Sequence, residues 1–251
     1  MSIESLRNES AERAGHFATT QWSVVLACGD RERPEATAAL AQLCETYWYP
    51  LYTYVRRQVG DVHEAQDLTQ AFLANFLEKE LVAKADPERG RFRSYLLTAC
   101  KRFLINEWHK ARAAKRGGGQ FTLSLDWESG ESRFTQLDAE TLTAEQLYEQ
   151  QWAMTLLQRV MEQLRAEQEA KGKLAQFDVL KQFLAGATDE AGYGEAGKSL
   201  GISEGAAKVA AHRLRGRYRE LLRKEIAQTV SEPDEVDDEI RSLFAVLSGR
   251  K

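Results

Sequence analysis

Apolar residues recur at intervals of three and four positions through most of this 251-residue chain, and this spacing constrains its fold more than any other feature. In the segment 34–59 the apolar positions include Leu40, Leu43, Tyr47 and Leu51. Only four prolines interrupt the chain, and no long run alternates apolar and polar residues as a half-buried strand would. We therefore predict an all-α protein.

Changes in this pattern divide the chain. The segments 62–78 and about 94–115 continue the helical spacing, and Gly117-Gly118-Gly119 ends it because glycine is costly inside a helix. The predicted order is a flexible tail (1–18), a first small helical domain (19–116), an acidic linker (117–143), a second helical domain (144–230) and an acidic C-terminal extension (231–251).

Charge is distributed unevenly along the chain. The net charge is −4, whereas a protein that binds bare DNA by itself is usually basic. Nevertheless, Arg89–Arg116 holds nine Lys or Arg and one acid, and Lys208–Lys224 holds seven and one. Two basic blocks separated by an acidic stretch indicate two separate contacts with a polyanion.

Features of location point to the cytoplasm. The three cysteines are scattered without a CxxC pair, which fits a reducing compartment and small buried apolar roles. The segment 1–20 is polar and charged, unlike a signal peptide, and no apolar stretch is long enough for a membrane span. We expect no membrane association.

The segment Glu195–Arg217 predicts a helix-turn-helix. Gly201 supplies the turn between two helices, flanked by the apolar anchors Leu200 and Ile202. Ser203 stands where an N-cap would accept a backbone hydrogen bond. Gly197 and Ala207 are small enough for a close crossing of the helices.

The second helix of this motif has an apolar and a polar face. Ala207, Ala210 and Leu214 are expected to face inward, leaving a polar face suited to a DNA major groove. The residues expected to contact DNA are Ser203, Glu204, Lys208, His212, Arg213, Arg215 and Arg217. The alternative is a solvated basic helix in a bundle.

Gly192–Ser199 matches the phosphate-loop pattern GxxxxGK[ST]. That loop requires a buried strand before it and a long helix after it. Polar residues precede it and Gly201 follows closely, so we expect no nucleotide site.

Aromatic and basic residues alternate in the first basic block. Bases can stack on such rings while phosphates contact the cations, as in single-stranded nucleic-acid sites. Phe103 and Trp108 fall on or near the apolar stripe, however, and a place in the core is the favoured reading for both.

Taken together, these segments resemble the extracytoplasmic-function (ECF) sigma factors of bacterial RNA polymerase over about residues 19–230. Leu43–Leu77, with Asp67-Leu68-Thr69-Gln70, resembles the first half of sigma region 2. The stretch from Phe92-Arg93-Ser94-Tyr95-Leu96 to Lys115-Arg116 resembles the part that melts and reads the −10 element, and residues 145–224 resemble region 4.

The resemblance implies roles for particular residues. Asp67, Leu68 and Gln70 would dock on the clamp of the polymerase largest subunit, and the helix-turn-helix set would read the −35 element. The residues expected to bind −10 DNA are Arg91, Arg93, Tyr95, Lys101, Arg102, His109, Lys110 and Arg112. In the linker, Asp126, Glu128 and Glu131 either enter the polymerase active-site channel or belong to a plain solvated tether.

The sequence thus predicts a sigma factor whose partners are core RNA polymerase, through its clamp and flap, and promoter DNA. Regulation by an anti-sigma factor or another partner is left open. The alternatives are a stand-alone helix-turn-helix regulator and a DNA-processing enzyme. The four histidines are scattered and no paired-carboxylate motif stands out, so we expect no catalysis, metal, cofactor or small-molecule substrate.

Overall fold

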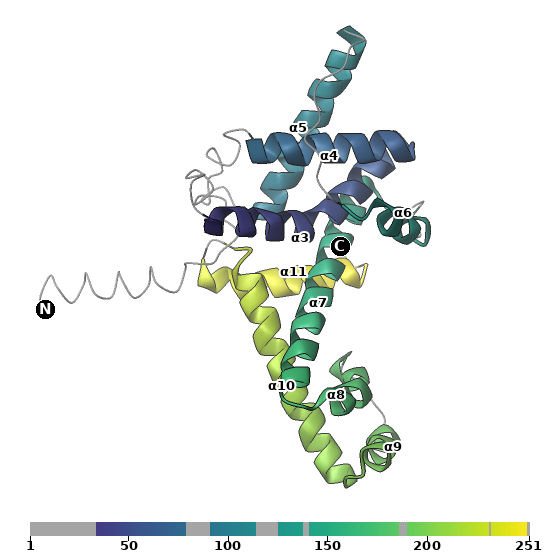
Figure 1. Ribbon diagram of the computed structural model, residues 1–251, viewed down its shortest axis with the longest axis vertical. Helices are drawn as coiled ribbons and strands as arrows, with labels where there is room; N and C mark the ends of the chain where they lie inside the picture. Colours follow the sequence, from purple (N-terminus) through teal and green to yellow (C-terminus); the bar gives the residue numbers. More distant parts are fainter. Residues whose placement is uncertain are drawn as a thin grey trace, which may run out of the picture. The chain divides into compact units, whose positions relative to one another are not determined.

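The computed structural model describes residues 34–78, 91–113, 125–137, 141–185, 190–230 and 232–249. Within these ranges the regular structure consists of α-helices and short 3₁₀ helices, without strands (Figure 1). The all-α prediction is confirmed. The helix expected around residues 21–28 lies outside the described residues.

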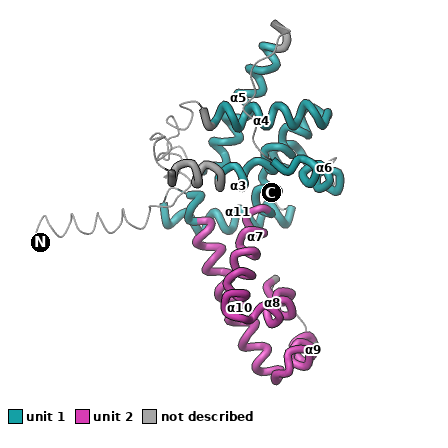
Figure 2. The backbone as a smooth tube through the Cα atoms, viewed as in Figure 1, with its two compact units in different colours: residues 1–154, 227–251 teal, residues 155–226 magenta. Residues whose placement is uncertain are grey.

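The chain divides into two compact units, coloured separately in Figure 2. Unit 1 comprises Met1–Met154 and Ala227–Lys251, and unit 2 comprises Thr155–Ile226. The boundary therefore falls inside a helix and not at the predicted residue 144. The reason lies in the side chains that precede Thr155: Tyr148 and Trp152 are buried against residues of unit 1.

Unit 1 is built on three helices, α3 (Pro34–Val59), α4 (Val62–Glu78) and α5 (Phe92–Ala113). The bounds of α3 and α4 are those that the apolar spacing predicted. Gly60, at φ +79°, allows the chain to reverse between them, and Asp61 begins α4 by accepting a hydrogen bond from Glu64 N at 2.8 Å. The buried side chains of their core include Tyr47, Leu51, Val55, Phe72, Phe76, Phe92 and Leu96.

A further helix of unit 1, α6 (Trp127–Thr135), lies within the predicted linker. Trp127 packs edge-on against Trp48 and Tyr52 of α3, with ring centroids 5.7 Å apart in each pair. Gly130 is buried against the Trp48 ring, and a Cβ at this position would lie only 3.0 Å from that ring. The acidic composition of this stretch concealed an aromatic contact surface, so this part of the predicted linker is folded onto α3.

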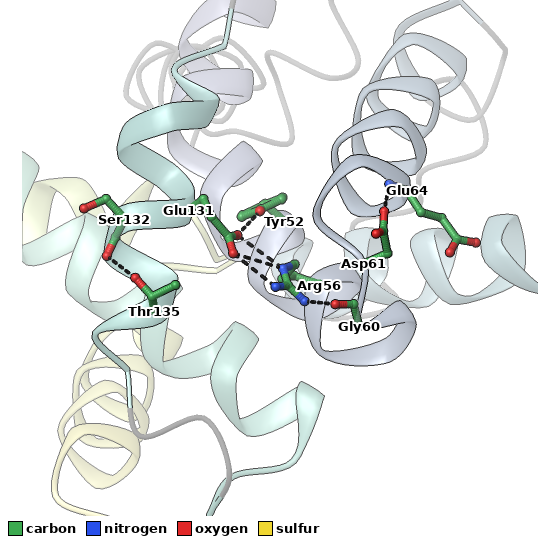
Figure 3. A network of polar contacts seen from close by, with 8 residues as sticks. All are labelled: Tyr52, Arg56, Gly60, Asp61, Glu64, Glu131, Ser132 and Thr135. Atoms are coloured by element: carbon green, nitrogen blue, oxygen red, sulfur yellow. Dashed lines mark hydrogen bonds and ion pairs between the residues drawn. The ribbon is translucent and has the colours of Figure 1, made fainter.

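Polar contacts hold the same helix in place. Glu131 accepts hydrogen bonds from the Tyr52 hydroxyl and from Arg56, whose Nη2 lies 3.1 Å from the carboxylate (Figure 3). Burial of the Tyr52 hydroxyl, and then its hydrogen bond to this carboxylate, raise the pKa of Tyr52. Glu131 is therefore committed to α3, whereas Asp126 and Glu128 remain exposed.

The second half of the chain contains α7 (Ala144–Ala170), α8 (Leu174–Leu180), α9 (Glu190–Leu200) and α10 (Glu204–Ala227), with a 3₁₀ helix at Lys181–Ala185. The core of unit 2 includes Leu156, Val160, Leu164, Phe177, Leu180, Phe183 and Leu214. The C-terminal extension forms a 3₁₀ turn, Pro233–Glu235, and α11 (Val236–Leu247), and both belong to unit 1.

Candidate nucleic-acid and polymerase interfaces

Helix α4 presents part of the motif Asp67-Leu68-Thr69-Gln70. Asp67 is exposed, Leu68 and Gln70 are half-buried, and Thr69 is fully buried with its hydroxyl donating to Ala65 O at 2.7 Å. The helix therefore positions Asp67 at the surface by burying Thr69 two residues later.

Helix α5 has a continuous exposed face. Arg102, Ile105, Asn106 and His109 are all exposed and follow the spacing i, i+3, i+4 and i+7, which places them on one side of a helix. Ile105 and Asn106 were absent from the predicted set, although their spacing from Arg102 in the sequence would have identified them.

Trp108 corrects the reading of the aromatic residues of α5. It is 40% exposed, whereas Phe103 packs against Phe72 with ring centroids 5.6 Å apart. The neighbouring helix covers only part of the apolar stripe of α5, so Phe103 is packed and Trp108 is left exposed. The exposed indole lies beside His109 in the sequence and is available for stacking on a base.

Other members of the predicted −10 set are engaged within the protein. Tyr95 is half-buried among the rings of Phe76 and Phe92, and burial raises its pKa. Lys101 pairs with Glu145 at 2.8 Å, and Lys110 pairs with Glu107 at 2.7 Å on the exposed surface. The side chain of Arg112 lies outside the described residues.

The first two members of that set, Arg91 and Arg93, both contact the C-terminal helix α11. Arg93 is 3% exposed, lies 4.2 Å from the Trp152 ring centroid and pairs with Glu149 at 2.6 Å and with Glu239. Arg91 also pairs with Glu239, at 2.8 Å. Arg93 is therefore closed to DNA in this arrangement, and Arg91 is engaged although its side chain is 38% exposed. The partners of both arginines lie far away in the sequence.

In unit 2, a tight turn joins α9 to α10 at the position that the sequence predicted. Gly201 has a φ of +65°, and Ile202 N donates to Gly197 O at 2.9 Å, which closes the turn. Ser203 Oγ accepts from Ala206 N at 3.2 Å as the N-cap of α10. A Cβ on Gly197 would lie 2.9 Å from Ile202 O, so only glycine fits at this crossing.

The faces of α10 follow the expected pattern with one change. Ala207, Ala211 and Leu214 are buried, so Ala211 takes the inward position expected of Ala210. Ser203, Glu204, His212 and Arg213 are exposed, and Lys208 is partly exposed. Glu204 and Lys208 form an ion pair of 2.8 Å on this surface.

Two arginines of the predicted −35 set have protein partners. Arg215 donates to Phe183 O at 3.0 Å and to the Tyr193 hydroxyl at 3.2 Å, and it thereby ties α10 to the stacked Phe183–Tyr193 rings. Arg217 makes a two-pronged contact with Glu167 of α7, at 2.6 and 2.8 Å. The hydrogen bond from Arg217 lowers the pKa of Glu167.

The phosphate-loop pattern Gly192–Ser199 lies wholly inside α9. A helix cannot provide the loop of converging N–H groups that a nucleotide phosphate needs. The structure thus agrees with the sequence reading of this match as fortuitous.

Comparison with known proteins gives one match. Residues 43–114 match the family model of sigma-70 region 2. This part of the chain is a sigma-70 region 2 domain. No curated protein and no solved structure matches.

Sigma-70 region 2 covers α3 from Leu43, α4 and α5, so the exposed motif of α4 and the exposed face of α5 both lie inside it. A sigma-70 region 2 domain supports a role in promoter recognition for RNA polymerase. Helix α6, unit 2 and α11 lie outside the match. In the part of the chain that the structure describes, no helix is long and apolar enough to cross a membrane.

Proposed function

We propose that the protein is a sigma factor of the extracytoplasmic-function type. Region 2 in unit 1 binds the polymerase clamp through α4 and the −10 element through α5. The helix-turn-helix of unit 2 acts as region 4 and binds the −35 element. The protein itself carries out no covalent chemistry.

The observation that carries this proposal is the exposed face of α5 within the sigma-70 region 2 match. Arg102, His109 and Lys110 supply positive or hydrogen-bonding groups there, and Ile105 and Trp108 supply apolar and aromatic surface. Cations beside an exposed ring suit single-stranded DNA better than duplex DNA, because an unpaired base can stack. An initiation factor that holds melted DNA needs such a surface.

Unit 2 supports the second contact. The turn at Gly201 and the cap at Ser203 begin α10 as a recognition helix begins. His212 and Arg213 are exposed on it, and Lys208 is partly exposed. A stand-alone regulator would use the same helix, but it would need neither a region 2 nor the exposed Asp67.

Charge reversal of Asp67 distinguishes a sigma factor, which must bind polymerase, from a stand-alone regulator. Asp67→Lys should weaken binding of core RNA polymerase by roughly tenfold or more, because a like charge at an interface is costly. Promoter-dependent run-off transcription should fall with it. The matched control is Glu45→Lys, which makes the same charge change at an exposed position of α3.

Binding is measured by titration of labelled core polymerase, and folding by circular dichroism. Equal affinities of folded Asp67→Lys and Glu45→Lys would contradict the docking role. Tight promoter binding without polymerase, together with no specific transcription when polymerase is added, would favour the stand-alone regulator.

A further inference from the structure

The C-terminal extension buries one carboxylate against region 2. Glu239 of α11 is 0% exposed and pairs with Arg91 at 2.8 Å and with Arg93. Ser242, one turn later, accepts hydrogen bonds from Arg91 at 3.2 Å and from Arg93 at 3.3 Å. The extension therefore places one buried carboxylate and one hydroxyl group against the same two arginines.

These arginines stand at the beginning of α5. Arg91 precedes the helix, and its carbonyl accepts from Ser94 N and Tyr95 N at 3.0 and 3.2 Å. A helix N-terminus favours anions, and two guanidinium groups beside it strengthen that preference. Glu239 is thus the anion of an anion-binding site within sigma-70 region 2.

The contacts of α11 contribute little net free energy to its binding, so the helix can be displaced. A buried ion pair contributes little net stability, because the desolvation of both charges offsets their attraction. When the whole helix leaves, carboxylate and guanidinium groups are both rehydrated. The apolar anchors of α11 are few: Val236 and Leu243 are buried, while Phe244 remains 50% exposed.

The acidic composition of the extension also favours its release when DNA approaches. Residues 232–239 contain six acids, and Asp234, Asp237 and Asp238 are exposed. Such a segment is repelled by the phosphates of an approaching DNA strand and attracted by the basic block at 89–116. DNA and α11 therefore compete for the same positive surface.

We propose that α11 is an internal competitor of promoter DNA, with Glu239 occupying the position that a DNA phosphate takes between Arg91 and Arg93. The inference rests on the proposed function, since it assumes that region 2 binds single-stranded promoter DNA. In the free protein α11 holds this site closed. Binding of melted DNA displaces α11 and exposes at least Arg91, while Arg93 can keep Glu149.

The test compares Glu239→Gln with Asp234→Asn in the full chain, without polymerase. Both variants remove one negative charge from the extension, but Asp234 is exposed. The probe is a fluorescent single-stranded DNA of about 20 nucleotides. Glu239→Gln should bind it roughly tenfold more tightly than Asp234→Asn does, the size of one charge-assisted contact.

Salt dependence distinguishes freed arginines from a general change in charge. The slope of log K against log salt should steepen by between about 0.7 and 1.4 in Glu239→Gln, because one or two more phosphates are neutralised. Adding Arg91→Ala to Glu239→Gln should remove most of the gain. Unchanged affinity and slope in a folded Glu239→Gln variant would show that α11 is only a structural clasp.

Hydrogen exchange of the wild-type chain gives a result that needs no variant to fold. Amides of residues 236–247 should exchange faster when the single-stranded DNA is added, and equal or slower exchange would overturn the proposal. Run-off transcription with core polymerase tests the proposed function separately. If transcription fails while DNA still displaces α11, the sigma-factor role is wrong and the competition stands.

Discussion

The arginines of this protein show how residue type underdetermines role. Arg93 is buried between carboxylates and the Trp152 ring, and Arg215 is held by Phe183 O and the Tyr193 hydroxyl. Arg102 and Arg213, by contrast, are exposed. A guanidinium carries five donors and a flat face, so it serves equally well in protein packing and in phosphate binding.

Arg217 also has a structural role, and the effect of its removal on the free energy of unfolding should depend on pH. Its hydrogen bond lowers the pKa of Glu167, so the pair stabilises the fold above the usual glutamate pKa and is lost as pH falls through the lower, folded value. Arg217→Ala should therefore reduce the free energy of unfolding at pH 7, by at most about 1 kcal/mol because the pair is partly exposed. At pH 3 the difference from wild type should be smaller.

Denaturant titrations at the two pH values measure this, with the exposed Arg213→Ala as the control. A loss of the same size at pH 3 and pH 7 would mean that Arg217 acts through packing of its aliphatic stem and not through Glu167.

Among the elements, α6 shows how a short helix depends on its neighbours. A helix of nine residues is marginal alone, because nucleation costs more than so few hydrogen bonds return. Contacts outside its own backbone stabilise α6: the N-cap at Asp126, the packing of the Trp127 ring and the ion pair between Glu131 and Arg56. Of the three acids in the described part of this linker, Glu131 is committed to α3, and Asp126 and Glu128 remain exposed.

The crossing of α9 and α10 can be tested at Gly197. Gly197→Ala should cost about 1–3 kcal/mol of stability, because the new methyl meets the backbone oxygen of Ile202 at 2.9 Å and the helices must move apart. Binding of duplex DNA by α10 should fall as well.

Gly216→Ala is the matched control, since a Cβ there meets nothing within 4 Å and lies inside α10. It should stabilise the helix by roughly 0.5–1 kcal/mol. Thermal and denaturant unfolding measure both variants, and equal stability of the two would mean that the crossing is not tight.

On the scale of the whole molecule, a chain of net charge −4 carries two basic blocks, at 89–116 and 208–224. Arginines of both blocks pair with carboxylates of the protein, and the net negative charge repels DNA. We therefore expect weak DNA binding by the free protein and strong binding once polymerase holds both units on one promoter.

Lys208 should then influence which −35 sequences the holoenzyme prefers. Its ion pair with Glu204 is partly exposed and contributes little stability, so the side chain can turn toward a base edge. Lys208→Ala should change discrimination at one base position by about 1–3 kcal/mol.

A randomised −35 library, transcribed by holoenzyme, measures this preference. Arg165→Ala, an exposed change on α7, should leave it unaltered. If Lys208→Ala lowers all sequences by the same factor, Lys208 contacts the backbone and does not read bases.

The sequence by itself determined the helices α3 and α4 and the turn at Gly201. These depend on local properties: the period of apolar residues, and a positive φ that glycine adopts without strain. The same local signals located the motif of α4 and the helix α10, and the match to sigma-70 region 2 agrees with the reading of the first domain.

The tertiary structure decided which side chains remain accessible. It exposed Trp108, folded α6 onto α3, and brought Glu239 to Arg91 and Arg93 from the far end of the chain. Periodicity gives the face of a helix but not the partner that covers it. Whether an arginine meets DNA or a carboxylate thus depends on contacts between segments distant in sequence, which no local pattern encodes.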